Sequence, residues 1–315
     1  MRCALGVDTS CYTTSIALAG EGGALISRRR LLEVELGARG LRQSEALFQH
    51  VQRLPEMMED MLAEAETAEI VCVCASARPR DAEGSYMPVF TAGTGFARAL
   101  AAALRVPFFA TSHQQGHVRA AMEGAGPLPE EFLALHLSGG TTEALHVRPG
   151  LQIGLLGGSS DLHAGQLVDR VGVRMGLGFP AGPEMETLAR RGTAKGAFPL
   201  SHREGEVSFS GAEAQAMRML DAGAAREDVA AEVYSYIARA VAYLIGWAYG
   251  RTRLDTALVS GGVASSALLR ELLPARLQRM ACPARVRWGR PEMSGDNACG
   301  VALIGWEEYI HGKDT

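Results

Sequence analysis

The chain of 315 residues carries 31 basic and 35 acidic side chains, for a formal net charge of -4, and 47% of its residues are hydrophobic. This composition is typical of a globular protein with a full core, built as one large domain or as two lobes. It excludes binding to nucleic acid through overall charge, so contact with a polyanion would need a local basic patch such as Arg28 to Arg30.

Strands and helices alternate through the first part of the chain. Strands are expected in "CALGVD" and "SIALAG", around a polar turn, and again in "EIVCVCAS". A helix of small residues is expected in "GTGFARALAAAL", followed by the extended stretch "RVPFFATS" and a helix over residues 113–122. This alternation predicts an α/β fold.

The pattern restarts in the second part of the chain. "FLALHLSGGTTEALHV" predicts a strand, a turn and a strand, and it resembles "CALGVDTSCYTTSIALAG" about 130 residues earlier. Helices are expected near residues 163–176 and 229–250, and a strand, a glycine turn and a helix in "TALVSGGVASSALLRELL". The last helix would be capped by Ser294 or Asp296.

This internal similarity predicts two related lobes. We expect the first lobe to comprise residues 1–110, with a C-terminal helix of residues 296–315 packed back onto it. Residues 111–295 would form the second lobe.

The cysteines and the apolar segments bear on where the protein works. Cys72 and Cys74 lack the two-residue spacing of a zinc knuckle or redox motif, so buried free thiols in a reducing compartment are expected. No signal peptide precedes the first expected strand, and "ARAVAYLIGWAYG" is shorter than the roughly 20 residues that cross a bilayer. We therefore expect a cytoplasmic protein with no membrane partner.

Three turns rich in glycine and hydroxyl residues follow apolar strands: "DTSCYTTS", "LSGGTTEAL" and "VSGGVASS". Backbone amides in such turns can approach a phosphate closely. Together they favour a nucleotide cleft between duplicated lobes, an arrangement similar to the actin, sugar-kinase and heat-shock-ATPase superfamily. Asp8 would lie at that cleft, near a cation or capping its own turn.

The stretch "ATSHQQGHVRAAM" places His113 and His117 on one face of the expected helix, where both rings can reach one ion. The alternative is a pair of surface or half-buried histidines. A zinc peptidase would use the residue after the first histidine as its general base, and Gln114 cannot serve as one. An ion held here would need at least one further ligand, for which a carboxylate is suited.

Motifs along nearly the whole chain resemble the tRNA N6-adenosine threonylcarbamoyltransferases, a family once described as O-sialoglycoprotein endopeptidases. "HQQGH" is similar to the family's H-x-E-G-H, "LHLSGGTTEAL" to V-S-G-G-H-T-x-L, and "SGDNACGVA" to T-D-N-A-A-M-I-A. "DLHAGQLVDRVGVRMGLGFPAGP", "VSFSGAEA" and "VSGGVASSALLRE" match further family motifs in the same order.

This resemblance implies a divalent ion, iron or zinc, held by His113, His117 and Asp296. Asp169 and Gly182 lie where the family holds the ribose of its adenylate. From the turns and the resemblance together, the residues expected to bind substrate or nucleotide are Asp8, Ser138, Gly139, Gly140, Thr141, Asp169, Gly182, Gly261, Gly262 and Ser266.

The implied reaction transfers a threonylcarbamoyl group from threonylcarbamoyl-adenylate to the N6 amine of the adenosine beside the tRNA anticodon. The expected ligands are thus an adenine nucleotide or that adenylate, and the expected partners are tRNA, a small paralogous subunit and an ATPase. Because AMP is a good leaving group, no protein nucleophile is needed.

Some positions depart from the family's motifs. Tyr12 and Thr13 replace an acidic pair, Gln115 a glutamate, Thr141 a histidine, Ser266 an asparagine, and residues 212–214 an L-K-T triplet. A paralogue with an altered acceptor is one reading of these changes. A non-catalytic nucleotide- and metal-binding paralogue that regulates or partners a true enzyme is the alternative. A kinase is less favoured, because it would need no histidine pair, and a peptidase least, because it lacks a base.

Overall fold

The computed structural model describes residues 1–23, 25–34, 41–295 and 297–314, and the chain divides into two compact units. Unit 1 comprises Met1–Glu123 and Gly295–Thr315, and unit 2 comprises Gly124–Ser294. The division falls after Glu123, and not at residue 110, because helix α3 (His113–Met122) packs on the C-terminal helix α9 (Cys299–Asp314).

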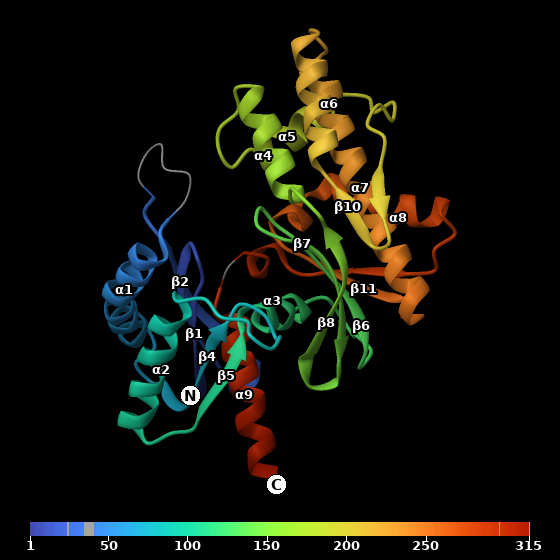
Figure 1. Ribbon diagram of the computed structural model, residues 1–315. Coiled ribbons are helices and arrows are strands. Elements are labelled where there is room, and N and C mark those ends of the chain that lie inside the picture. Colours follow the sequence, from blue (N-terminus) through green and yellow to red (C-terminus); the bar gives the residue numbers. More distant parts are fainter. Residues whose placement is uncertain (24, 35–40, 296, 315) are drawn as a thin grey trace. The chain divides into compact units, whose positions relative to one another are not determined.

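Unit 1 is built on a sheet with the strand order β3-β2-β1-β4-β5 (Figure 1). The first three strands form an antiparallel meander, and β4 and β5 continue the sheet parallel to β1. The elements are β1 (Arg2–Thr9), β2 (Thr13–Gly20), β3 (Leu25–Leu31), α1 (Gln43–Glu64), β4 (Glu69–Arg78), α2 (Phe90–Leu104) and β5 (Phe108–Ser112).

Helices cover both faces of this sheet, as the alternation of side chains along β1 shows. Cys3, Leu5 and Val7 belong to the core under α1 and α2. Gly6, which points to the opposite face, lies against the backbone of α9, where a Cβ would be 2.4 Å from the amide nitrogen of Ala302. Glycine at this position therefore lets α9 lie directly on the strand.

Helix α9 approaches α3 just as closely. A Cβ on Gly300 would lie 1.8 Å from the carbonyl oxygen of Gly116. We expect Gly300→Ala to lower the free energy of unfolding by about 1–3 kcal/mol or more, since the clash is with backbone and α9 must shift. Gly312→Ala, in open space on the same helix, is the control and should stabilise slightly. Urea denaturation of both variants measures this, and equal stability would contradict the close packing.

The sheet of unit 2 repeats that of unit 1. Its order is β12-β11-β6-β7-β8-β10-β9, in which β8-β7-β6-β11-β12 corresponds to β3-β2-β1-β4-β5. The same antiparallel meander, here β6, β7 and β8, is followed by two parallel strands. The strands are β6 (Phe132–Leu137), β7 (Thr142–Arg148), β8 (Gln152–Ser159), β9 (Ser201–Arg203), β10 (Glu206–Ser208), β11 (Thr256–Ser260) and β12 (Arg285–Trp288). The internal similarity in the sequence thus corresponds to a shared topology.

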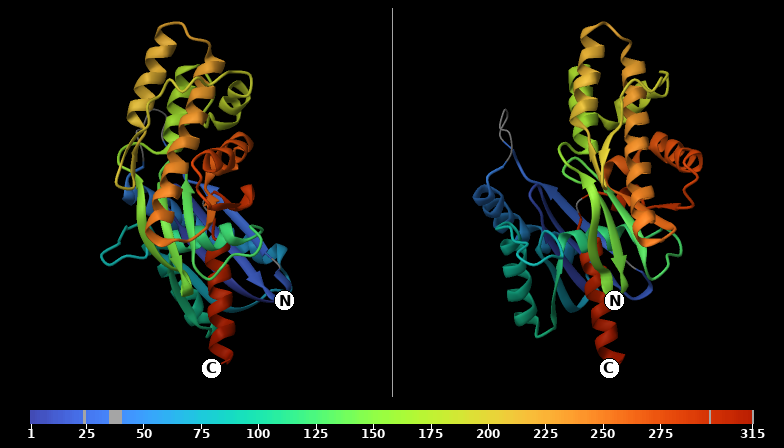
Figure 2. Two further views of the ribbon diagram at one scale, coloured as in Figure 1. Left: turned by 90° about the vertical axis from the view of Figure 1, so that its right-hand side faces the viewer. Right: turned by 45° about the vertical axis from the view of Figure 1, so that its right-hand side comes forward.

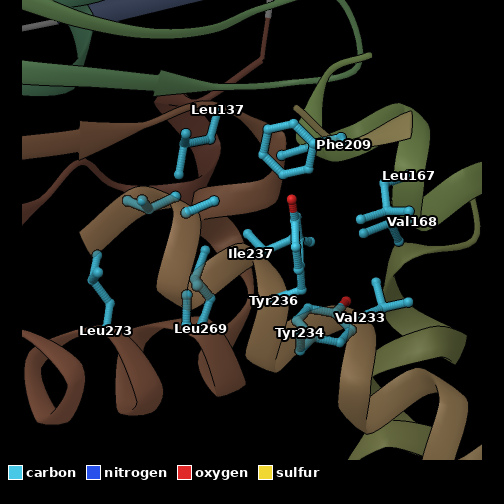
Figure 3. Close-up of a cluster of buried hydrophobic side chains, with 14 of the residues drawn as sticks. Leu137, Leu167, Val168, Phe209, Val233, Tyr234, Tyr236, Ile237, Leu269 and Leu273 are labelled. Atoms are coloured by element: carbon cyan, nitrogen blue, oxygen red, sulfur yellow. The ribbon is translucent and has the colours of Figure 1, made fainter. Parts of the chain in front are cut away.

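Helices α4, α6 and α7 of unit 2 stand side by side (Figure 2), and α5 and α8 also pack on α7. Buried side chains of α7 and α8 such as Ile237, Leu269 and Leu273 form the core together with Leu167 of α4 (Figure 3). The helices of unit 2 are α4 (Ala164–Arg174), α5 (Gly182–Ala189), α6 (Ser210–Asp221), α7 (Arg226–Thr252) and α8 (Ala267–Arg279), with the short 3-10 turn η3 (Gly262–Ser265) before α8.

The structure shows the state of the cysteines and the lengths of the apolar helices. The six cysteines, all among the described residues, form no disulfide bond, and burial raises the pKa of Cys72 to about 12, so this thiol is unsuited to nucleophilic chemistry. Among the described residues, no helix is both long and apolar enough to cross a bilayer.

Candidate functional site

The histidine pair lies at the start of α3, which a capping box fixes in place. The Ser112 hydroxyl accepts a hydrogen bond from the Gln115 amide nitrogen at 3.1 Å. The Gln115 side-chain oxygen in turn accepts from the Ser112 amide at 2.9 Å and from the Thr111 hydroxyl at 3.0 Å. Because glutamine and glutamate serve equally as the third residue of a capping box, Gln115 preserves the local structure in place of the family's glutamate.

The rings of His113 and His117 converge, as four-residue spacing on a helix requires. Their Nε2 atoms are 3.0 Å apart and the ring planes meet at 78°. Phe90 of α2 packs beside His113, with ring centroids 5.7 Å apart. The two nitrogens therefore lie within hydrogen-bond distance of each other.

Asp8 lies behind His113, at the end of β1. Its carboxylate oxygens are 2.9 and 3.0 Å from Nδ1 of His113, and the Asp8 side chain is about 1% exposed. Since a carboxylate can only accept here, Nδ1 of His113 donates, and Nε2 is the nitrogen turned toward His117. A carboxylate behind an imidazole orients many metal-binding histidines in this way.

This arrangement fits two ligands of a divalent ion. A zinc ion lies about 2.0–2.1 Å from each histidine nitrogen that binds it, so two such nitrogens lie about 3 Å from each other. The Nε2 atoms of His113 and His117 are 3.0 Å apart. Asp296, the third expected ligand, lies outside the residues that the structure describes. Within the described part of the chain, no group of three His, Cys, Asp or Glu side chains is arranged to hold an ion.

In unit 2 the turn Ser138–Thr141 joins β6 to β7, with the Ser138 amide donating to the Thr141 carbonyl at 2.8 Å. The start of α4 is held against this turn: the Gly165 amide donates to the Ser138 carbonyl at 3.1 Å. A Cβ on Gly165 would lie 2.7 Å from the amide nitrogen of Gly139, so only glycine permits this contact. The turn and the start of α4 are thus in direct backbone contact.

A cavity of about 500 Å³ opens beside this turn, within the size range of small-molecule sites. It brings together five of the residues expected to bind nucleotide: Gly139, Asp169, Gly182, Gly262 and Ser266. Its other lining residues are Gly165, Val168, Pro180, Pro183, Glu186, Tyr234, Val263 and Ser265. Residues from five separate segments of unit 2 therefore meet around one space.

The remaining expected residues do not line this cavity. Ser138, Gly140 and Thr141 belong to the adjoining turn, and Asp8 contacts His113 in unit 1. Gly261 has a structural role, because its φ is +98° and a Cβ there would lie 2.3 Å from the Leu137 carbonyl oxygen.

The cavity presents acceptors for sugar hydroxyls. Asp169 uses one oxygen to accept from the Ala181 amide at 2.8 Å, and Glu186 accepts from the Leu268 amide at 2.8 Å. No lysine or arginine is among the lining residues that the structure describes. Two carboxylates in this setting favour the ribose of a nucleotide over its phosphate.

Glu186 and Tyr234 were not among the predicted site residues. Burial raises the pKa of Tyr234, so its hydroxyl stays protonated and donates to the Gly182 carbonyl at 3.0 Å. Glu186 follows Gly182 by four residues on α5 and therefore shares its face, a spacing that could have identified it. Tyr234 lies in the middle of an apolar stretch, which carries no such signal.

Several departures from the family's motifs have local explanations. Ser266 is the N-cap of α8 and accepts from the Leu269 amide at 3.1 Å, a role that asparagine also performs. Ala212 is buried in the core, and Glu213, in place of the family's lysine, forms an ion pair with Arg170 at 3.3 Å. Tyr12 is 49% exposed, and Thr13 is buried at the start of β2.

Known proteins similar to this chain point to one family. The family model described as tRNA N6-adenosine threonylcarbamoyltransferase matches residues 37–301. A protein of that name from Thermus thermophilus is 33% identical, covering 98% of this chain and 93% of its own length. One from Aromatoleum aromaticum is 32% identical, covering 96% and 90%.

Among solved structures, a ROK hexokinase from Thermus thermophilus has a TM-score of 0.56 at 17% identity, covering 99% of this chain and all of that chain. This similarity confirms the expected two-lobed sugar-kinase and actin-like fold.

Proposed function

The chain belongs to the tRNA N6-adenosine threonylcarbamoyltransferase family, and we propose on that premise that it transfers a threonylcarbamoyl group from threonylcarbamoyl-adenylate to the N6 amine of the adenosine beside the tRNA anticodon. In this reaction the amine nitrogen forms a bond to the carbamoyl carbon, the bond from that carbon to the phosphate oxygen breaks, and AMP and a proton leave. The observation that carries the proposal is the full-length relationship to this family, combined with a cavity that collects five of the predicted nucleotide-binding residues.

The cavity of unit 2 would hold the adenosine part of the donor. Asp169 and Glu186 would accept hydrogen bonds from the ribose hydroxyls, and the open backbone at Gly139 would face the ligand, since a Cβ there meets nothing within 4 Å. Fixing the donor in this way lowers the entropic cost of bringing its carbonyl to an amine.

The histidine pair of unit 1 would hold one divalent ion, iron or zinc, with Asp296 as the expected third ligand. When bound, such an ion supplies positive charge for a phosphate or a carbonyl oxygen. His113 would bind the ion through Nε2, because its Nδ1 is held by the bond to Asp8. Gln114 is then no defect, because this chemistry needs no neighbouring base.

A transfer assay tests the proposal directly. Purified protein is incubated with threonylcarbamoyl-adenylate labelled in its threonine and with tRNA, with and without a small paralogous subunit and an ATPase, and label in the tRNA is counted. We expect transfer to tRNA, and none to a transcript in which guanosine replaces the acceptor adenosine. Protein that binds AMP and metal but labels no tRNA under any of these conditions would refute transferase activity and favour a non-catalytic paralogue.

A further inference from the structure

His50 is a fully buried histidine on α1 that none of the sequence motifs includes. Both of its ring nitrogens are engaged: Nε2 lies 2.8 Å from the Ser10 carbonyl oxygen, and Nδ1 lies 2.8 Å from the Thr14 hydroxyl. Burial lowers the pKa of His50, against the opposing effects of the Ser10 hydrogen bond and the Asp8 charge. The ring is therefore neutral at physiological pH.

These two partners define the tautomer of His50. Because a carbonyl oxygen can only accept, Nε2 carries the proton and donates to Ser10. Nδ1 of the neutral ring then accepts from the Thr14 hydroxyl. One ring thus joins α1 to both sides of the turn between β1 and β2.

Asp8 lies on β1, two residues before Ser10 of that turn. In the register of the hairpin, Asp8 pairs with Ser15, and Thr9 pairs with Thr14. Thr14, whose hydroxyl bonds His50, is therefore one residue pair away from Asp8. On the other side, the Thr9 hydroxyl donates to the Val89 carbonyl at 2.9 Å and ties the strand to the start of α2. The end of β1 is therefore held from α1 by His50 and from α2 by Thr9.

We propose that His50 is a positioning residue for His113: by bonding Ser10 and Thr14 it holds the β1–β2 turn so that the Asp8 carboxylate stays on Nδ1 of His113. The importance of His113 as a metal ligand rests on the proposed function, but the positioning itself is a property of the metal-free protein. Loss of the bonds from His50 releases the turn, and His113 loses its fixed tautomer and orientation.

Two measurements on His50→Leu test this. In metal-free protein, the imidazole ¹⁵N shifts of His113 report its tautomer, and we expect a change from predominantly Nδ1–H to a mixture. Zinc affinity, measured by competition with a chelator, should fall about 10- to 100-fold, as it does when the group behind a metal ligand is lost. His50→Gln, whose amide can still donate to the Ser10 carbonyl, should recover part of both. Thr14→Val, which removes only one of the two bonds, provides an intermediate case should the leucine variant fail to fold.

Leu54→Ala is the matched control, because Leu54 is buried on the next turn of α1 and makes no polar contact with the hairpin. It should destabilise the fold while leaving the His113 shifts and the zinc affinity unchanged. Unchanged His113 shifts in His50→Leu, or equal effects in Leu54→Ala, would overturn the proposal. A wild-type protein that binds no zinc would instead count against the metal site alone, since the shifts still report on His50.

Discussion

Protein carrying both His113→Ala and His117→Ala is expected to lose its divalent metal, from about one ion per chain to nearly none, and to remain folded. The Nε2 atoms of these residues are 3.0 Å apart, so removing both takes away two converging ligands. Transfer of the threonylcarbamoyl group to tRNA should fall at least about 100-fold. Loss of a residue that is hydrogen-bonded to a metal ligand costs about 10- to 100-fold, and loss of the ligands themselves should cost more. Metal analysis of protein purified without chelators, circular dichroism and the tRNA assay measure the three quantities.

A double variant elsewhere separates metal loss from a general effect of removing two imidazoles. His146 and His202 lie in unit 2, where His146 pairs with Glu131 at 2.8 Å and His202 stacks on Tyr243. His146→Ala with His202→Ala should keep its metal. If the His113 and His117 variant keeps its metal as well, the ligands lie elsewhere in the chain.

The histidine pair could be predicted from the sequence because the relevant signal is local. Four-residue spacing on one helix places both rings on the same face whatever the rest of the chain does. The contact between Asp8 and His113 joins residues 105 positions apart and depends on how β1 and α3 meet, which no local pattern encodes. The turn sequence alone was compatible both with a cation beside Asp8 and with Asp8 capping its own turn, and it does not distinguish the two.

The fold was predictable where hydrophobic patterns are strong and harder to predict where they are weak. The expected strands around both hairpins correspond to β1, β2, β6 and β7, and the helix expected at residues 113–122 is α3. Helix α1 was not predicted, because Pro55 lies within it and its buried face includes the polar His50. Ser294, one of the two predicted caps of the last helix, donates its hydroxyl to the Arg290 carbonyl instead, and Asp296, the other, lies outside the described residues. At the start of this helix, Asn297 accepts from the Cys299 amide at 3.0 Å.

Gly182→Val is expected to weaken binding of AMP by about 10- to 100-fold while leaving the fold intact. Gly182 lines the cavity, and a Cβ there would meet no protein atom within 4 Å, so the added methyl groups occupy space that a ligand needs. Steric overlap of this size costs about 1–3 kcal/mol, and each 1.4 kcal/mol is tenfold in affinity. The free energy of unfolding should change by less than about 1 kcal/mol, because glycine is itself unfavourable in a helix.

Calorimetric titration with AMP and urea denaturation measure these effects, with Gly250→Val as the control. Gly250 is exposed on α7, also has open space at its Cβ position, and does not line the cavity, so its substitution should leave AMP affinity unchanged. Unaltered AMP binding by Gly182→Val would place the nucleotide outside this cavity.

Zinc binding should be equal in Gly182→Val and Gly250→Val, because the histidine pair belongs to unit 1. The His113→Ala and His117→Ala double variant should in turn still bind AMP. Loss of AMP binding alone in Gly182→Val, and of metal binding alone in the histidine double variant, would show that the two ligands bind at separate sites.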